Sequence, residues 1–160
     1  MDLTFLGTRG DIAKRTRRHR RHSALLVTVA NARILLDCGA DWLRRIDALQ
    51  PTAIVLTHGH PDHASGLANG APCPVYATDE TWQLLAAYPI TERRIMPQRE
   101  PIDLSGVIFE AFAVEHSTRA RPLQFEPRPA PPKKDDAGVV CNRGVQCASR
   151  CRPCGERRSQ

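Results

Sequence analysis

The chain has 160 residues and a mass of 17.8 kDa, a length that suits one compact domain rather than two. Its formal net charge of +6 and isoelectric point near 9.3 favour anionic partners such as phosphate esters or nucleic acid, with a solvated basic surface as the alternative. No apolar stretch approaches the ~18 residues of a membrane-spanning helix, and the N-terminus lacks a secretory signal, so we expect a cytoplasmic protein without a membrane partner.

Apolar runs in the first quarter of the chain predict strands. Residues 3–6 form a short run that Gly7 ends, and a long polar loop follows. Residues 24–29 and 33–36 are rich in apolar and β-branched side chains and flank residues 30–32, which predicts a hairpin.

A short helix is expected after the hairpin. Asp41 can cap it, and Trp42, Ile46 and Leu49 recur at helical spacing. Pro51 then ends the helix, because proline cannot continue a helical hydrogen-bond pattern.

A histidine-rich segment follows the next predicted strand, residues 53–56. Pro61 suits the first turn of a helix, where its missing amide proton is not needed, and Asp62 is favoured near a helix N-terminus. The segment around these residues therefore lies at a strand-to-helix junction.

The elements downstream follow the same signals. Residues 74–77 predict a strand, and Asp79 is expected to cap a helix that carries Trp82. Residues 102–104 and 107–114 predict a strand pair that turns at Ser105 and Gly106.

The junction segment has the composition of a metal site. His58 and His60 are two apart on an extended stretch, so their imidazoles project to one side, and Asp62 and His63 follow within one helical turn. Imidazole and carboxylate together suit Zn²⁺, with Mn²⁺ or Fe²⁺ as alternatives. A lone histidine is more often a packed or surface residue, but four such donors within six residues predict a metal site.

This His-x-His-x-Asp-His motif resembles the signature of the metallo-β-lactamase superfamily. Residues 5–10, 35–39 and 55–57 are similar to the branch that contains ribonuclease Z and the cyclic phosphodiesterases. The resemblance covers residues 2–120 and implies an α/β fold, the αββα sandwich of that family.

The resemblance also implies the roles of individual residues. His58, His60 and His116 would hold a first metal ion, while Asp62 and His63 would begin a second site and take part in catalysis. A hydroxide held by one or two ions would attack phosphorus or carbonyl carbon, so the implied protein is a metal-dependent hydrolase, above all a phosphodiesterase.

Asp37 is expected at a strand end that faces the same region. It either orients a ligand histidine by accepting its second N–H, or it caps the turn at Gly39. The sequence leaves both roles open.

A basic loop, residues 14–22, carries six lysine or arginine residues and two histidines between the first two predicted strands. In the family fold this loop lies near the active-site edge, so we expect it to contact a phosphate ester, a nucleotide or RNA. The alternative is a solvated loop, and the lack of an interleaved aromatic argues against a dedicated nucleic-acid module. The expected substrate-binding residues are Arg17, Arg18, Arg20, Arg21 and His22.

The chain departs from the family after about residue 120. Complete members supply a bridging aspartate and a further histidine, but no histidine follows His116, and Asp135 and Asp136 follow a proline-rich stretch instead of a strand. We therefore expect an incomplete sandwich, with residues 1–120 as a partial domain and residues 121–160 as a disordered or out-of-frame tail. A frameshift near Ala120 accounts for this composition, and translating the other two frames tests it.

The tail holds four of the six cysteines, which is not the pattern of a secreted disulfide framework. They can bind one structural zinc, although their intervals are irregular. These cysteines are Cys141, Cys147, Cys151 and Cys154.

Three functions remain open from the sequence: an active metal-dependent hydrolase, a catalytically inactive truncated remnant, and a nucleic-acid-binding protein that uses the basic loop. The sequence does not identify the substrate, the metal or the oligomeric state.

Overall fold

The computed structural model describes residues 1–114, 123–125 and 128–129, all within a unit that spans Met1–Ala130. The predicted ligand His116, the four clustered cysteines and the predicted frameshift point lie outside the described residues. The boundary at residue 120 and the nature of the tail stay predictions.

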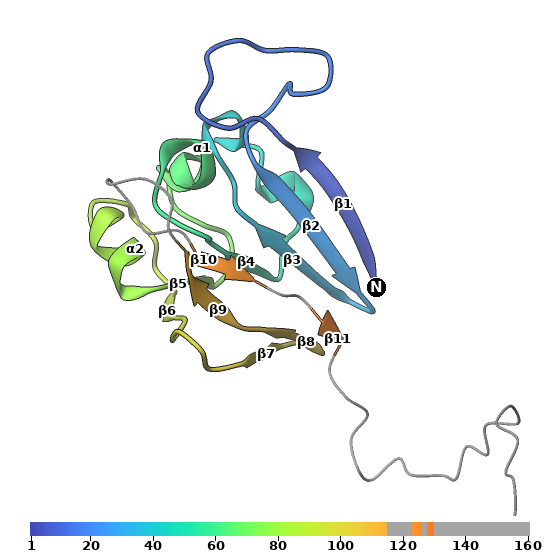
Figure 1. Ribbon diagram of the computed structural model, residues 1–160, viewed down its shortest axis with the longest axis vertical. Helices are drawn as coiled ribbons and strands as arrows, with labels where there is room; N and C mark the ends of the chain where they lie inside the picture. The colour runs from blue at the N-terminus through green and yellow to red at the C-terminus, as the bar shows by residue number, and fades with distance from the viewer. Residues whose placement is uncertain (115–122, 126–127, 130–160) are drawn as a thin grey trace, which may run out of the picture. The chain divides into compact units, whose positions relative to one another are not determined.

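A six-stranded sheet with the strand order β1-β2-β3-β4-β5-β6 forms most of the described structure (Figure 1). The strands β1, β2 and β3 pair antiparallel with one another, and β3, β4, β5 and β6 pair in parallel. The strands predicted for this part of the chain and the hairpin are confirmed. The strand β6 was not predicted, because it is exposed and contains two arginines instead of an apolar run. The strands are β1 (Asp2–Gly7), β2 (Ala24–Val29), β3 (Ala32–Leu36), β4 (Ala53–Val55), β5 (Val75–Ala77) and β6 (Arg93–Ile95).

Shorter strands pair in two smaller sheets. The prediction of one continuous strand over residues 107–114 is wrong. The strand is interrupted at Glu110, and its two parts pair with different strands. Two strands beyond residue 120 were not anticipated, since that stretch is rich in proline. The sheets are β11-β8-β7 and β10-β9, made of β7 (Ile102–Leu104), β8 (Val107–Phe109), β9 (Ala111–Ala113), β10 (Leu123–Phe125) and β11 (Arg128–Pro129).

Short helices connect the parallel strands. The predicted helix after β5 is confirmed, but its cap lies one residue earlier: the Thr78 hydroxyl accepts from the Thr81 amide at 3.4 Å. In the described part of the chain, no helix has the length and apolar character needed to cross a membrane. The helices are η1 (Ala40–Trp42), η2 (Asp47–Leu49), α1 (Pro61–Ala64), η3 (Ser65–Leu67) and α2 (Asp79–Leu84).

The helix predicted from Asp41 to Leu49 is wrong. Two 3₁₀ turns, η1 and η2, replace it, and Arg44 between them has a φ of 60°, which no continuous helix allows. Asp41 makes no capping hydrogen bond because its carboxylate binds Arg9 and Arg15 instead.

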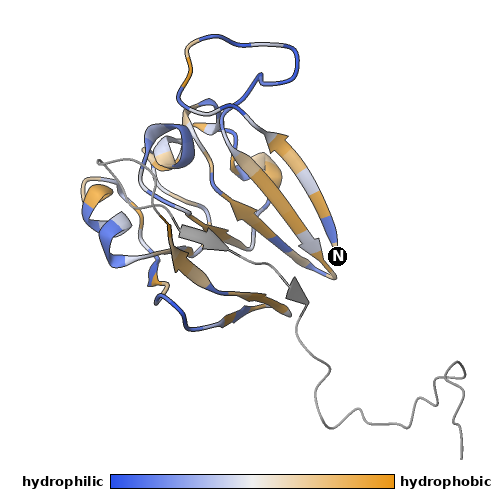
Figure 2. Cartoon of the chain, in the orientation of Figure 1, coloured by the Kyte–Doolittle hydropathy of each residue, from blue (hydrophilic) through white to orange (hydrophobic). Residues whose placement is uncertain are grey.

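Both faces of the large sheet are covered by apolar side chains, and Figure 2 shows the apolar character along β2 and β3. Leu35 and Ile54 point to one face, where they join a core cluster that includes Trp42. Ile34 and Val55 point to the opposite face and pack with the second cluster, which includes residues of β7 to β9. The junction after β4 is therefore held between two cores.

Replacing Ile54 with alanine tests this packing. Ile54 is 0% exposed in a central strand, so Ile54→Ala should lower the free energy of unfolding by about 2–5 kcal/mol in urea denaturation. Ile95→Ala is the matched control: Ile95 is 60% exposed on the edge strand β6, and its loss should change stability by less than about 0.5 kcal/mol. Equal effects of both substitutions would contradict the assignment of Ile54 to the core.

Candidate metal centre

The candidate site forms where the parallel strands β3 and β4 end. Their register sets Leu36 beside Val55, so the residues that follow each strand emerge at the same edge of the sheet. The Asp37 amide donates to the Val55 carbonyl at 2.9 Å, and the Cys38 amide donates to the His63 carbonyl at 2.7 Å. These bonds tie the end of β3 to both β4 and α1.

The Asp37 carboxylate lies at the centre of this junction and is buried. It accepts hydrogen bonds from the Thr57 amide at 2.8 Å, from the Thr57 hydroxyl at 2.9 Å and from His63 Nδ1 at 2.7 Å. It does not cap the turn at Gly39, whose amide donates to the Ser23 carbonyl at 3.3 Å. The geometry brings Asp37 to a candidate ligand histidine.

These contacts set which ring nitrogens carry protons. A carboxylate only accepts, so the Thr57 hydroxyl proton points to Asp37 and its oxygen is left to accept from His58 Nδ1, 2.9 Å away. His63 likewise directs Nδ1–H to Asp37. In both rings the nitrogen turned to the opposite side is Nε2, which is the arrangement that outer hydrogen-bond partners impose on metal-binding histidines.

Opposing effects act on the pKa of His63. Burial favours the neutral imidazole and by itself lowers the pKa. The hydrogen bond and charge of Asp37, together with the charge of Asp62, outweigh burial and raise the pKa above its usual value.

The predicted donors gather on one side of the junction. His58 Nε2 lies 3.0 Å from His60 Nδ1, and the ring centroids of His58 and His63 are 4.1 Å apart. Asp62 Oδ2 lies 3.3 Å from His63 Nε2, while Asp62 Oδ1 is buried and has no hydrogen-bond partner among the described residues.

A buried carboxylate oxygen without a partner is costly, and a cation would satisfy it. Imidazoles and a carboxylate are also donors that suit Zn²⁺, Mn²⁺ or Fe²⁺, so the residues present fit a metal in their chemistry. As arranged, the side chains in the described ranges contain no group of three or more donors placed to hold an ion. The predicted role of His116, which lies outside those ranges, stays a prediction.

Gly39 allows the end of the basic loop to approach this centre. A Cβ atom on Gly39 would lie 2.0 Å from the Asp62 carbonyl oxygen and 2.4 Å from His22 Cβ, so no other residue fits without a shift. Of the predicted substrate-binding residues, His22 is thus the one packed beside the histidine segment.

Arg9 and Asp41 hold His22 in place. Neither was predicted from the sequence to be part of the site, since Asp41 was expected only to cap a helix. Asp41 Oδ2 binds Arg9 at 2.5 Å and lies 2.9 Å from His22 Nδ1. Burial by itself raises the pKa of Asp41, but the hydrogen bonds from Arg9 and the His22 amide lower it below its usual value. Burial lowers the pKa of His22, an effect that the charge of Asp41 only partly offsets.

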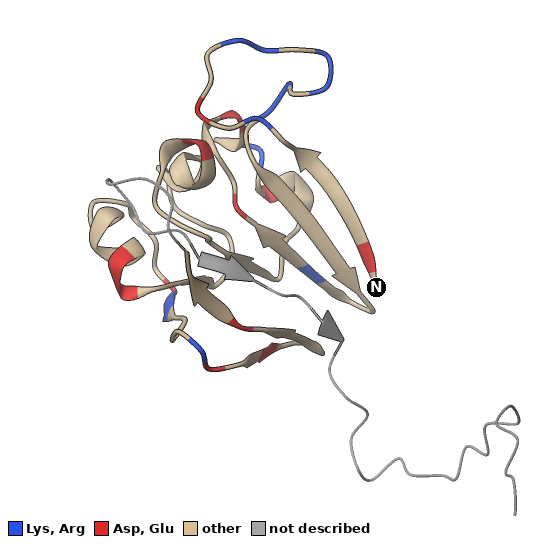
Figure 3. Ribbon diagram, viewed as in Figure 1, with Lys and Arg blue, Asp and Glu red and all other residues tan. Residues whose placement is uncertain are grey.

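The four predicted arginines share a hollow that the histidine segment does not line. They line a hollow of about 660 Å³ whose walls include Phe5 and Asp41 but no residue of the histidine segment. Figure 3 shows the concentration of positive charge on this loop. The structure therefore separates the predicted binding set into His22 near the centre and Arg17, Arg18, Arg20 and Arg21 in a hollow of their own.

Comparisons with known proteins relate the sequence to one family and to two ribonucleases. The sequence model of a family described as "Beta-lactamase superfamily domain" matches residues 32–145. Ribonuclease Z of Bradyrhizobium diazoefficiens is 42% identical over 72 residues, which cover 41% of this chain and 22% of that protein. Ribonuclease Z of Methanopyrus kandleri is 36% identical over 70 residues, covering 41% and 24%. The matches thus span about a quarter of these relatives' length.

Solved structures share the fold at low identity. The metallo-β-lactamase fold protein YhfI from Bacillus subtilis superposes with a TM-score of 0.60 at 17% identity, over 79% of this chain and 58% of that one. A diphosphatase from the PhnP family superposes with a TM-score of 0.52 at 24% identity, over 69% and 50%.

The pKa of His63 provides a test of the junction. In metal-free protein, Asp37→Asn should lower this pKa, because burial persists while the charge and the hydrogen-bonded carboxylate are lost; NMR titration of the imidazole measures it. The pKa of His63 is higher in the folded protein than its value of about 6.5 in the unfolded chain, so protonation of His63 stabilises the fold. This stabilisation is fully present below the unfolded pKa, and it is lost as the pH rises through the folded pKa. The stability difference between wild type and Asp37→Asn should therefore narrow with increasing pH.

Asp41→Asn is the matched control, because Asp41 contacts Arg9 and His22 instead of His63. It should leave the His63 titration in place. A His63 titration that is the same in wild type and Asp37→Asn would refute the assigned contact.

Proposed function

Because the chain belongs to the metallo-β-lactamase superfamily, we propose that it is a metal-dependent hydrolase of the cytoplasm that acts on phosphodiesters. The α/β metallo-β-lactamase fold expected from the sequence is confirmed, and the chain covers 58% and 50% of the two solved structures. The finer parts of the proposal, namely the metal, the substrate and the residues that act, rest on the geometry of the junction.

One observation carries the proposal: a buried carboxylate oxygen of Asp62, without a hydrogen-bond partner among the described residues, lies in a cluster of three histidines. A purely structural cluster would be expected to satisfy this oxygen internally. A cation is the partner that this set of donors suits.

His58 and His60, with His116, would hold one metal ion, and Asp62 and His63 would begin the second site, with Zn²⁺ as the expected metal and Mn²⁺ or Fe²⁺ as alternatives. Such a metal, when bound, would supply a nucleophilic water at neutral pH and would polarise the phosphoryl oxygen. Asp37 fixes the orientation of the His63 ring, and Thr57 does the same for His58. The burial of the Asp37 carboxylate keeps competing water away from its hydrogen bond to His63.

A phosphate-bearing substrate is supported by two lines of reasoning. Relatives named ribonuclease Z and a neighbour named as a diphosphatase share the sequence or the fold. His22, which Asp41 contacts beside the centre, would bind an oxygen of a phosphate ester or nucleotide, and Arg17, Arg18, Arg20 and Arg21 would add positive charge on the same loop. An RNA substrate fits the same chemistry.

Substitution of His60 tests the proposal. His60→Ala removes one donor and should abolish both bound metal, measured by elemental analysis of the purified chain, and hydrolysis of bis(p-nitrophenyl) phosphate. His19→Ala is the matched control for metal content, since His19 is exposed and bonds Thr8 within the loop. Hydrolysis by the wild-type chain after its metal has been removed would refute the proposal. A wild-type chain that binds metal but does not hydrolyse the ester would favour an inactive remnant.

A further inference from the structure

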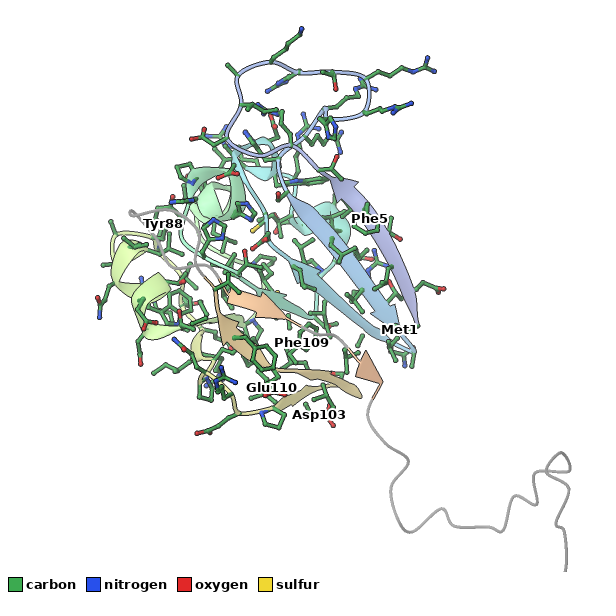
Figure 4. All side chains as sticks on the ribbon, viewed as in Figure 1. Met1, Phe5, Tyr88, Asp103, Phe109 and Glu110 are labelled. Atoms are coloured by element: carbon green, nitrogen blue, oxygen red, sulfur yellow. The ribbon has the colours of Figure 1, made fainter. Side chains whose placement is uncertain are left out.

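A second candidate site lies between the basic loop and the edge strand β1. The hollow of about 660 Å³ described above is walled by arginines of the loop, with Arg45 and Phe5 completing it. Figure 3 marks the lysine and arginine positions along the loop in blue, and Figure 4 shows Phe5 on β1. A further hollow of about 380 Å³ on the same loop is lined by Arg15, Thr16, Arg17 and Arg20.

The loop is braced along its length. The Thr8 hydroxyl donates to the Arg18 carbonyl at 3.2 Å, and the Arg9 amide donates to the Arg21 carbonyl at 2.9 Å. The Arg21 guanidinium lies 5.0 Å from the ring centroid of Trp42, within range of a cation–π contact. The arginines are thus presented from an internally bonded scaffold that limits the entropy lost on binding.

Much of the positive charge in the hollow is not neutralised by the protein. Arg15 pairs with Asp41 at 2.6 Å. Among the residues that the structure describes, Arg17, Arg18 and Arg20 form no ion pair with a carboxylate. Several like charges around one hollow repel one another, and a chain of phosphates would relieve this repulsion.

Phe5 adds an aromatic surface to this charge. Its side chain is 71% exposed although it is large and apolar, and it shares a wall with the arginines. The sequence offered no aromatic residue within the basic loop, but the antiparallel pairing of β1 with β2 brings Phe5 to it. A basic groove beside an exposed aromatic ring is the combination that single-stranded nucleic acids use, with phosphates on the charges and a base on the ring.

We propose that this hollow binds a single-stranded segment of nucleic acid, with backbone phosphates on Arg17, Arg18 and Arg20 and one base stacked on Phe5. The site is distinct from the histidine segment, none of whose residues lines it. The arginines of this hollow are also those proposed above to add positive charge for a phosphate-bearing substrate, but nucleic-acid binding in the hollow requires neither metal nor hydrolysis.

Binding of a short fluorescein-labelled oligouridine to the full chain, followed by fluorescence anisotropy with EDTA present, tests the charges. Arg20→Ala should weaken binding and reduce the slope of log affinity against log salt by about 0.7. Arg94→Ala is the matched control: it also removes one charge, but from β6 at the opposite edge of the sheet, and should leave both quantities nearly unchanged.

A second pair of variants tests the ring. Phe5→Ala should weaken binding by about fivefold to a hundredfold with the salt slope retained, as expected for one stacked base, and Phe5→Trp should preserve affinity. Leu3→Ala is the control, because Leu3 is 46% exposed on the same strand but does not line the hollow. A duplex of the same length should bind without dependence on Phe5.

Equal losses in Arg20→Ala and Arg94→Ala would overturn the proposal in favour of a diffuse positive field. Oligouridine binding that Phe5→Ala leaves unchanged would overturn it in favour of a general polyanion surface. EDTA removes metal from every arm, so a negative result here leaves the proposed hydrolase intact, and an inactive hydrolase leaves this site intact.

Discussion

The buried Asp37 carboxylate is the constraint on which the junction depends. It directly follows β3, accepts two hydrogen bonds from Thr57, two residues beyond the end of β4, and accepts a third from His63 in α1. Removing a charge from water is costly unless hydrogen bonds replace the solvent, and here three donors on two elements do so. The same bonds that satisfy the carboxylate fix where the histidine segment starts and how its rings face.

The basic loop depends on this junction through Gly39 and Asp41. Because Gly39 has no side chain, the chain after β3 packs against Asp62 and His22 at once. Asp41, two residues on, then gathers Arg9 and His22 from the two ends of the loop. The base of the loop is thus held by Asp41 and packs against the candidate metal donors at Gly39.

Local signals gave the strands and the histidine motif, and these could be predicted from the sequence. Asp41 shows why the remainder could not: its position after a strand and before Trp42 favours a helix cap, but a buried arginine thirty-two residues earlier in the chain outweighs that local preference. The strand β6 could not be predicted from an apolar pattern, because its residues are exposed and include two arginines. Its backbone pairing with β5 holds it in the sheet. Phe5 looked like one more apolar strand residue, and only the fold sets it beside the arginines.

The two sites have opposite electrostatic character. Three carboxylates that are largely shielded from solvent, those of Asp37, Asp41 and Asp62, gather around the junction with Arg9 as the one buried arginine among the described residues. Such a region favours a cation. The hollow of about 660 Å³ is lined largely by arginines and favours an anion. Asp41 lies between the two regions and forms ion pairs with Arg9, which is buried, and with Arg15, which lines the hollow. These ion pairs reduce the electrostatic effect of each region on the other. A polyanion in the hollow would therefore meet the positive charge of the loop away from the carboxylates of Asp37 and Asp62, neither of which lines the hollow.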